Sequence, residues 1–256
     1  MFITAVNTKE AILLYDVTDR KFLIKHHIYE KRHPASLTKE MTLYLVFKAL
    51  KEKKITFNTK FRVSKWAAMQ APCKISLICG EYTTIRLLIE SMIVHSANDS
   101  AVCIAEGLCK GNLKNFVRLM NRTAKKLGMH HTHFTNPTGL PDKTQFTTAF
   151  DLLKISHALQ RDFPEYFHFF RKTKFTYKKR TYYTRYRLIR KPGVYGIKTG
   201  YIAMSGFNVA TSAIRFDKRG RPHLLIAIVM GQPSSFERDR KTWQLLNHFY
   251  KGGKKC

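Results

Sequence analysis

Strand-like segments at both ends of the chain restrict its fold more than any other feature. Beyond residue 192 the sequence holds three apolar, β-branched runs, GVYGIKTG, GFNVATSAI and HLLIAIVMG, and the turn DKRGRP joins the last two. Near the N-terminus, the run from Ala11 to His26 predicts two short strands around a turn at Thr18 to Arg20. The sequence between these regions has helical periodicity. We therefore expect an α/β (α+β) fold in which one antiparallel, five-stranded sheet is built from both chain ends, is flanked by helices and carries an inserted, mainly helical subdomain.

The middle of the chain is predicted to be a series of helices separated by polar turns. Thr83 and Thr84 are expected to start a helix over IRLLIESMIV, and the tetrapeptide SAND, Ser96 to Asp99, to form a loop before the next helix. A helix over Phe116 to Leu127 ends at Gly128. The other predicted elements are a turn-rich loop at 136–142, a helix at 149–159 opened by a Thr148 and Asp151 capping box, and a last helix over ERDRKTWQLLNHFY.

The charge of the chain is far from balanced. Its 46 Lys and Arg residues against 17 Asp and Glu residues give a formal net charge of +29. Such a field attracts polyanions, which include nucleic acid, an anionic membrane surface and the acidic polymers of a bacterial envelope. Charge alone does not choose among them, and a lysine-rich proteome would produce the same charge without any partner.

Cysteine content and hydropathy exclude some classes of protein and leave others open. The five cysteines show no zinc-binding spacing and no CxxC motif, and their odd number leaves at least one thiol unpaired. No run of about 18 apolar residues occurs, so no transmembrane helix is predicted. The first 16 residues lack a basic segment followed by a long apolar one, so we expect no signal peptide in this chain. The redox compartment stays open.

Three short motifs carry the chemistry that the sequence suggests. They are Ser36-Leu37-Thr38-Lys39, Ser96-Ala97-Asn98 and Lys198-Thr199-Gly200. If Ser36 begins a helix, Lys39 lies one turn away on the same face, and a hydroxyl beside a desolvated amine is an activated nucleophile. Each motif alone is common in a lysine-rich chain. Together, in this order, on a helix start, an interhelical loop and a strand, they form the pattern of serine β-lactamases and penicillin-binding proteins.

The chain resembles the low-molecular-mass penicillin-binding proteins that are D-alanyl-D-alanine carboxypeptidases. The resemblance spans roughly Ala11 to Tyr250 and rests on the segments PASLTKEMT, SANDSAVCIAE, LGMHHTHFTNPTGLPD, FTTAFDLLKI, GIKTGYIAMSGFNVATSA and IVMGQPSSFER. It implies a β-lactamase/transpeptidase-like fold and a single catalytic domain over residues 1–256, with the helical insertion at about 55–165. The C-terminal β-rich domain and the membrane anchor that relatives carry are expected to be absent from this chain.

The resemblance implies a serine peptidase mechanism without a cofactor. Ser36 would attack the carbonyl of a terminal D-Ala-D-Ala bond, form an acyl-enzyme and release D-alanine, and a neutral Lys39 would be the base. Ser96 would relay a proton to the leaving amine, and the Asn98 amide would bind the substrate backbone. The implied partners are peptidoglycan stem peptides that end in D-Ala-D-Ala and β-lactam antibiotics, which would acylate the same serine.

Substrate binding is assigned by the resemblance to the strand with Lys198 and Thr199. The Lys198 charge would attract the substrate carboxylate and hold the neighbouring lysine and serine in their active protonation states. Gly200 would leave room for the substrate to pair alongside the strand. The backbone N–H groups of Ser36 and Tyr201 would form the oxyanion hole.

The resemblance leaves one arginine assignment open and is broken at several positions. Arg238 would bind the terminal carboxylate with a two-pronged contact, but Arg240 competes with it in the segment ERDRK. Ala97 stands where relatives often have Gly, Tyr195 replaces an acid and Ile202 replaces a hydroxyl residue. The segment TRYRL stands for the amide-rich NRNRL of relatives. These differences affect substrate detail and rate rather than the class of reaction.

Three other functions are weighed against the carboxypeptidase. The segment Arg171 to Lys191 interleaves ten basic residues with five aromatic ones, which suits a nucleic-acid-binding surface, but relatives have an exposed hairpin there beside the active site. A catalytically idle penicillin-binding module stays an alternative, and a β-lactamase would need an acidic loop that the sequence lacks. His130 to His133 have no acidic partner nearby, so no metal site is predicted. The substrate implies an extracytoplasmic location.

Overall fold

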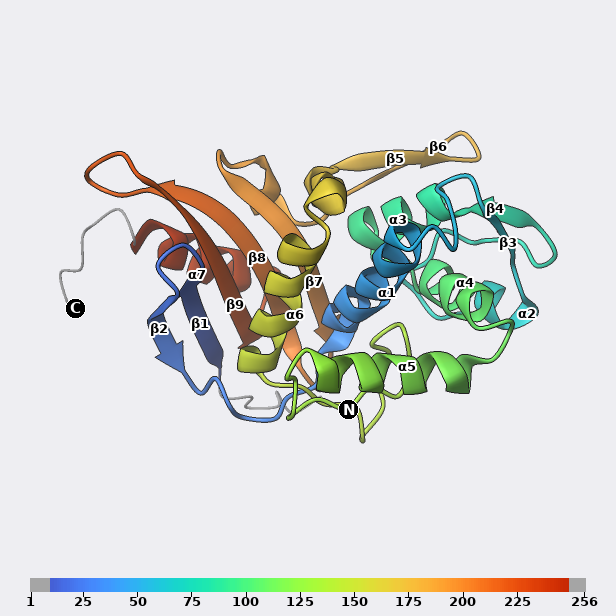
Figure 1. Ribbon diagram of the computed structural model, residues 1–256, viewed down its shortest axis with the longest axis horizontal. Coiled ribbons are helices and arrows are strands. Elements are labelled where there is room, and N and C mark those ends of the chain that lie inside the picture. Colours follow the sequence, from blue (N-terminus) through green and yellow to red (C-terminus); the bar gives the residue numbers. More distant parts are fainter. Residues whose placement is uncertain (1–9, 249–256) are drawn as a thin grey trace, which may run out of the picture.

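One five-stranded antiparallel sheet organises the computed structural model, which describes residues 10–248 (Figure 1). The strand order is β2-β1-β9-β8-β7, and β1 pairs with β9 from Ala11 opposite Met230 to Asp16 opposite Leu225. The strands are β1 (Ala11–Asp16), β2 (Lys21–His26), β7 (Val194–Ile202), β8 (Gly206–Phe216) and β9 (Pro222–Gln232). The predicted sheet from both chain ends is therefore confirmed.

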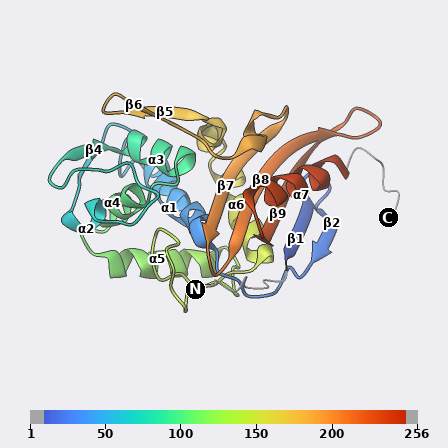
Figure 2. The same ribbon diagram turned by 180° about the vertical axis from the view of Figure 1, so that it is seen from behind.

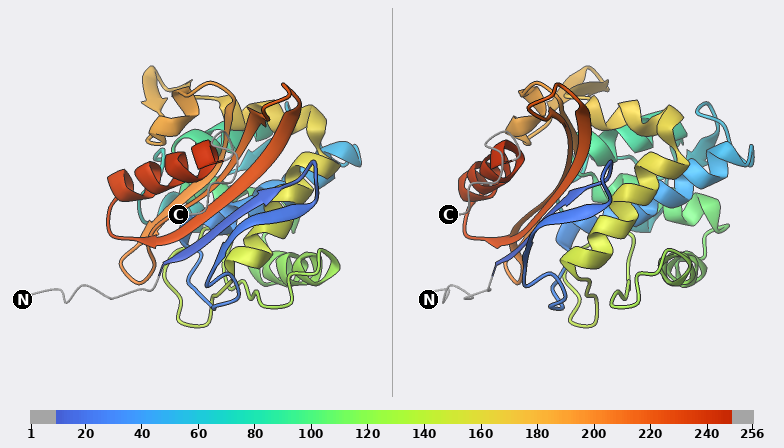
Figure 3. Two further views of the ribbon diagram at one scale, coloured as in Figure 1. Left: turned by 90° about the vertical axis from the view of Figure 1, so that its left-hand side faces the viewer. Right: turned by 60° about the vertical axis from the view of Figure 1, so that its left-hand side comes forward.

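Both faces of the sheet are buried, which explains why its strands are apolar without alternation. Along β9, Ala227 and Val229 belong to one apolar cluster, whereas Ile226 and Ile228 belong to the other. Helix α7 (Ser235–His248) covers the first face, and α6 (Ala149–Asp162) covers the second. Figures 2 and 3 show the sheet between α7 on one side and α6 with α1 and the other long helices on the other.

The segment between β2 and β7 forms the helical part of the molecule. Its helices contribute most of the larger apolar cluster. They are the 3-10 helix η1 (Ala35–Thr38), α1 (Lys39–Lys51), α2 (Lys65–Ala68), α3 (Ile85–Val94), α4 (Asn98–Leu108), α5 (Leu113–Lys126), and the 3-10 helices η2 (Pro164–Arg171) and η3 (Arg187–Arg190). Two short hairpins complete it: β3 (Lys60–Arg62) with β4 (Tyr82–Thr84), and β5 (Lys174–Tyr177) with β6 (Arg180–Tyr183).

Threonine caps start two helices where the sequence predicted them. The Thr84 side chain accepts a hydrogen bond from the backbone N–H of Leu87, and Thr148 accepts one from Asp151. The expected capping box at α6 is only half formed. The Asp151 carboxylate does not return to Thr148 but accepts hydrogen bonds from the His131 N–H and the Thr132 hydroxyl, because the loop before α6 packs against it.

Some element boundaries differ from those expected. Ser36 lies in η1, one 3-10 turn before α1, and α4 begins at Asn98, so only Ser96 and Ala97 of the SAND tetrapeptide precede that helix. Helix α6 continues past the predicted Leu159 to Asp162. The last two residues of the predicted C-terminal helix lie outside the described residues. None of the described helices is both long and apolar enough to cross a bilayer.

Candidate active site

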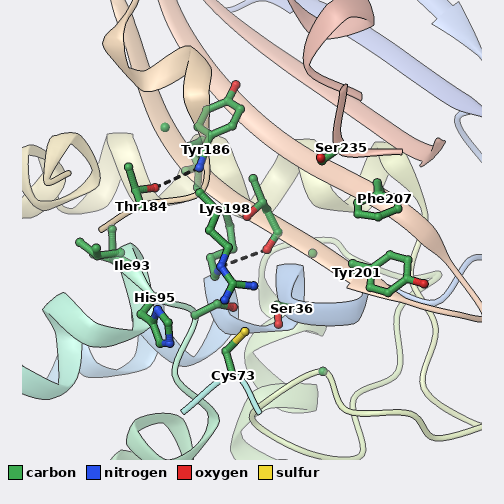
Figure 4. Close-up of a pocket in the computed structure, with 18 of the residues that line it drawn as sticks. Ser36, Cys73, Ile93, His95, Thr184, Tyr186, Lys198, Tyr201, Phe207 and Ser235 are labelled. Atoms are coloured by element: carbon green, nitrogen blue, oxygen red, sulfur yellow. Dashed lines mark hydrogen bonds between the residues drawn. The ribbon is translucent and has the colours of Figure 1, made fainter. Parts of the chain in front are cut away.

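A cavity of about 440 Å³ lies where the end of β7 meets η1 and the start of α4. Its lining includes eight of the nine residues that the sequence assigned to the site. These are Ser36, Ser96, Asn98, Lys198, Thr199, Gly200, Tyr201 and Arg238. The ninth, Lys39, is fully buried beneath Ser36. Figure 4 shows Ser36 and Lys198 near the centre of the cavity, with His95 to one side and Tyr201 and Phe207 to the other.

The position of Ser36 is fixed by two glycines that allow the backbone to approach closely. A Cβ on Gly200 would lie 2.9 Å from the Ser36 backbone nitrogen. A Cβ on Gly139, whose φ is +83°, would fall on the carbonyl of Ala35. The strand β7 and the turn at Gly139 therefore pack closely against η1 from two sides. We expected Gly200 to leave room for substrate, and the structure adds that it makes room for the nucleophile.

Lys39 Nζ has three oxygen neighbours. It lies 3.0 Å from Ser36 Oγ, 2.7 Å from Asn98 Oδ1 and 2.6 Å from the Thr138 carbonyl oxygen. Burial, and after it the charge of Lys198, hold the pKa of the Lys39 amine well below its ordinary value. The sequence spacing that placed the amine beside the hydroxyl is confirmed.

Asn98 links three parts of the site at the start of α4. Its Oδ1 accepts from Lys39, its Nδ2 donates to the Ala71 carbonyl at 2.9 Å, and its backbone N–H donates to the Cys73 carbonyl at 2.7 Å. The neighbouring Asp99 carboxylate accepts from the N–H groups of Ile75 and Leu77. Asn98 therefore orients the amine of Lys39, and its expected contact with substrate stays a prediction.

Ser96 is held in an unusual conformation just before α4. Its φ is +62°, a value that non-glycine residues seldom adopt. Its Oγ is buried and has no hydrogen-bond partner among residues 10–248. A buried hydroxyl without a partner is destabilising by about 1–3 kcal/mol, and a ligand in the cavity would remove that cost.

Lys198 brings a second buried amine to the cavity. Only 4% of the residue is exposed, and its Nζ donates to the Thr199 carbonyl at 3.0 Å. Burial lowers the pKa of Lys198 to about 8; the charge of Arg238 acts in the same direction, while Cys73 and Glu40 oppose it. Near neutral pH the Lys198 amine is mostly charged.

The structure distinguishes the two arginines that the sequence left in competition. Arg238 lines the cavity, is 4% exposed and lies 5.8 Å from the centre of the Tyr186 ring. Its guanidinium pairs with Asp239 at 2.7 Å. Arg240 is exposed, pairs with Glu237 at 2.6 Å and does not line the cavity. Arg238 is therefore the arginine available to a ligand.

Several cavity features were not predicted. The Thr138 carbonyl, a ligand of the Lys39 amine, is presented by a turn in which Asn136 Oδ1 accepts from the backbone N–H groups of Thr138 and Gly139. The turn itself was predicted, but the role of its carbonyl group was not, because every residue type has a backbone carbonyl. The thiol of Cys73 also lines the cavity and is close enough to both lysines to influence their pKa values (Figure 4).

Two further basic side chains, His95 and Arg185, line the cavity. Burial lowers the pKa of His95, and the charges of Arg185, Arg180 and Lys198 lower it further. Arg185 comes from the TRYRL segment, and this segment therefore faces the site. No Asp or Glu among residues 10–248 lines the cavity.

The departures from the family pattern fall on both sides of the cavity wall. Ile202, where the resemblance implied a hydroxyl residue, lines the cavity. Tyr195, where the resemblance implied an acid, does not line the cavity, and the centre of its ring lies 5.0 Å from the Arg171 guanidinium.

Within residues 10–248, one group of acidic and histidine side chains has the spacing of metal ligands. Asp16, Asp19 and His223 bring their ligand atoms within 4.8 Å of one another. They lie at the start of β9, whereas the cavity lies near the other end of that strand. His223 Nδ1 lies 2.8 Å from Asp16, and Arg221 forms an ion pair with Asp19. Both carboxylates therefore already have partners within the protein.

Comparison with known proteins decides the family. A model of the D-alanyl-D-alanine carboxypeptidase family, peptidase S11, matches residues 3–234. The chain belongs to this family. Among its curated members, DacC of Escherichia coli K12 is 34% identical over 92% of this chain, and DacF of Bacillus subtilis 168 is 32% identical over 95%. The chain spans 60% and 62% of these two relatives.

Solved structures of family members share the fold. Penicillin-binding protein 6B from E. coli is 32% identical, with a TM-score of 0.84 over 93% of this chain and 75% of that one. Penicillin-binding protein 5 from Haemophilus influenzae is 30% identical, with a TM-score of 0.87 over 93% and 69%. The cefotaxime-bound form of penicillin-binding protein D2 from Listeria monocytogenes is 27% identical, with a TM-score of 0.81 over 93% and 95%. The expected penicillin-binding-protein fold is confirmed.

Proposed function

We propose that this protein is a serine-type D-Ala-D-Ala carboxypeptidase that removes the terminal D-alanine from peptidoglycan stem peptides. The observation that carries the proposal is the set of three oxygens around Lys39 Nζ. A neutral amine has two N–H groups and one lone pair. The two shortest contacts, to Asn98 and Thr138, use the N–H groups, because both partners are carbonyl oxygens that only accept. The lone pair is then left for the hydroxyl of Ser36.

This arrangement supports attack by Ser36 on the substrate carbonyl. The Oγ forms a bond to the carbonyl carbon as its proton passes to Lys39, and the carbonyl oxygen becomes an oxyanion. The backbone N–H groups of Ser36 and Tyr201 are the proposed donors to that oxyanion. Removal of one such donor typically costs about 10²–10³ in kcat.

The leaving group needs a proton and a binding site for its carboxylate. In the proposed mechanism, the proton held by Lys39 passes through Ser96 to the nitrogen of the departing D-alanine as the C–N bond breaks. The unpartnered Ser96 Oγ is available for this exchange. Lys198 and Arg238 provide positive charge for the terminal carboxylate, and the acid-free lining favours an anionic ligand. Water then hydrolyses the Ser36 ester.

The same geometry supports acylation by β-lactams. A lactam presents an amide carbonyl and a carboxylate, as the D-Ala-D-Ala terminus does, and the related D2 protein has been solved with cefotaxime bound. Incubation with a labelled penicillin should add the mass of one penicillin at Ser36, and Ser36→Ala should remove the label. Label that persists in the variant would place the nucleophile elsewhere.

An idle penicillin-binding module is distinguished from the enzyme by turnover. We expect D-alanine release from diacetyl-L-Lys-D-Ala-D-Ala by the wild-type chain and none by Ser36→Ala. Stoichiometric label without turnover would favour the idle module. The proposed substrate also implies an extracytoplasmic location, which fractionation of the native cell would test.

The basic segment Arg171 to Lys191 supports a secondary proposal, contact with an anionic envelope polymer. Of its ten basic residues, only Lys172 and Lys178 have acidic partners in the described part of the chain, Glu90 and Glu81. Neutralising Lys174, Arg187 and Arg190 should weaken polymer binding and flatten its salt dependence while peptide hydrolysis survives. Equal loss of both activities would instead assign the hairpin to the active site.

A further inference from the structure

The end of the helical part opposite the sheet carries an unusual group of exposed apolar side chains. Trp66, Met69, Ile78 and Tyr82 are exposed by 58%, 64%, 54% and 65%. They account for four of the ten large apolar side chains that are exposed within residues 10–248. A concentration of exposed apolar side chains of this kind is typical of a surface that binds another molecule or a membrane.

Hydrogen bonding joins the strand that leads into α2 to the segment that ends at Tyr82, although the chain between them is long. In the β3–β4 hairpin Arg62 lies directly opposite Tyr82, so their side chains share one face. The Val63 N–H donates to the Glu81 carbonyl, and the Gly80 N–H donates to the Val63 carbonyl. Helix α2, which carries Trp66, follows at once. Figure 1 places α2, β3 and β4 at the end of the molecule away from the sheet, and Figure 2 shows α2 and β4 at the same end.

The outward face of this end is also basic. Lys60, Arg62 and Lys65 are exposed, and none of them has an acidic partner in the part of the chain that the structure describes. The single acid between residues 60 and 84 is Glu81, which Lys178 neutralises at 2.7 Å. We call the seven residues together the end patch: Lys60, Arg62, Lys65, Trp66, Met69, Ile78 and Tyr82.

We propose that the end patch docks on the surface of an anionic phospholipid bilayer. Lys and Arg side chains bind lipid phosphates with their charged ends while their methylene stems lie along apolar surface. Trp and Tyr rings favour the boundary between headgroups and acyl chains. Exposed Met69 and Ile78 favour lipid over a sugar-phosphate polymer or nucleic acid, because such polymers offer bases and sugars for aromatic stacking but no hydrocarbon for aliphatic side chains.

Docking in this way leaves the catalytic cavity open. None of the seven end-patch residues lines it. The proposal is therefore independent of the carboxypeptidase reaction, and a variant that loses lipid binding should keep penicillin acylation at Ser36. This second readout also reports that each variant is folded.

Co-sedimentation of the full chain with vesicles tests the proposal. The wild type should bind vesicles of equal phosphatidylglycerol and phosphatidylcholine at least about tenfold more tightly than phosphatidylcholine alone, and binding should fall with salt. The triple variant Lys60→Gln/Arg62→Gln/Lys65→Gln should bind about tenfold more weakly. A matched control, Lys114→Gln/Arg122→Gln/Lys126→Gln, removes three exposed charges from α5 and should bind within about threefold of wild type. Equal weakening in both variants would overturn the proposal.

Tryptophan fluorescence separates lipid insertion from simple attraction of charge. The chain has two tryptophans, so Trp243→Phe leaves Trp66 as the reporter. Its emission should shift to shorter wavelength on anionic vesicles and be quenched by brominated acyl chains. Ile78→Ser should weaken binding without a change in net charge. An unquenched Trp66, or vesicle binding that soluble polyphosphate abolishes at equal phosphate concentration, would show that the surface binds polyanions and not lipid.

Discussion

Substitution of Gly200 by alanine would test how the nucleophile is held in place. The added Cβ would lie 2.9 Å from the backbone nitrogen of Ser36 and 3.2 Å from both the Leu37 nitrogen and the Ala35 Cβ. Ordinary contacts of this kind begin near 3.4 Å, so η1 has to retreat by about half an ångström. Gly200 has no positive φ, and the effect is therefore one of contact and not of backbone strain.

Two magnitudes follow from that displacement. Overpacking of this kind typically destabilises by about 1–3 kcal/mol, and each kcal/mol lowers the Tm of a chain of this size by about 2–4 °C. The displaced Ser36 N–H is also a proposed oxyanion donor, and loss of one donor costs about 10²–10³ in kcat. We expect the Gly200→Ala variant to be folded below its lowered Tm but to release D-alanine about a hundredfold or more slowly.

A second glycine provides the control. Gly111 has a φ of +83°, and a Cβ added to it would have no neighbour within 4 Å, so Gly111→Ala should cost about 1–2 kcal/mol through backbone strain alone. It lies between α4 and α5 and should keep the wild-type kcat. D-alanine release, acylation by a fluorescent penicillin and thermal unfolding should be measured for both variants. A Gly200→Ala variant with wild-type kcat would refute the argument that β7 positions the nucleophile.

Two further predictions concern charge and the thiol in the cavity. Because the Lys198 amine loses its proton near pH 8, kcat/KM should fall as the pH rises through that value. Lys198→Arg should remove this alkaline fall in kcat/KM and should also lower kcat/KM at neutral pH. An unchanged alkaline fall in the arginine variant would assign the titration to another group. Iodoacetamide should slow penicillin acylation by filling the cavity at Cys73, and Cys73→Ser should be resistant. Inhibition that persists in the serine variant would point to one of the other thiols.

The parts of the site that sequence could predict are those that depend on spacing within one element. Ser36 and Lys39 are one turn apart in any helical conformation, so their contact needed no tertiary knowledge. Likewise, the apolar runs that became β7 to β9 have no alternative to burial. The choice between Arg238 and Arg240 could not be made, because it depends on how α7 is rotated on the sheet.

Other features arise only when distant segments meet. The hydrogen bond from Lys39 to the Thr138 carbonyl joins residues 99 positions apart, and it does not depend on residue 138 being a threonine. Asn98 was expected to bind substrate, yet its two amide ends are used by Lys39 and Ala71 because α4 packs between their segments. The half-formed capping box at Asp151 has the same origin, since the 131–132 loop competes for its carboxylate.

The pairing of β1 with β9 has a consequence for the order in which the chain folds. Ala11 meets Met230 only after more than two hundred residues have been synthesised, and closing so long a loop is entropically costly and slow. The β1–β2 hairpin would be marginal in water by itself, since it has only two strands. Helices α3 to α5, whose contacts are local, are expected to form first. During synthesis the edges of the N-terminal strands are therefore expected to stay unpaired until about the last quarter of the chain, which begins with β7, completes the sheet.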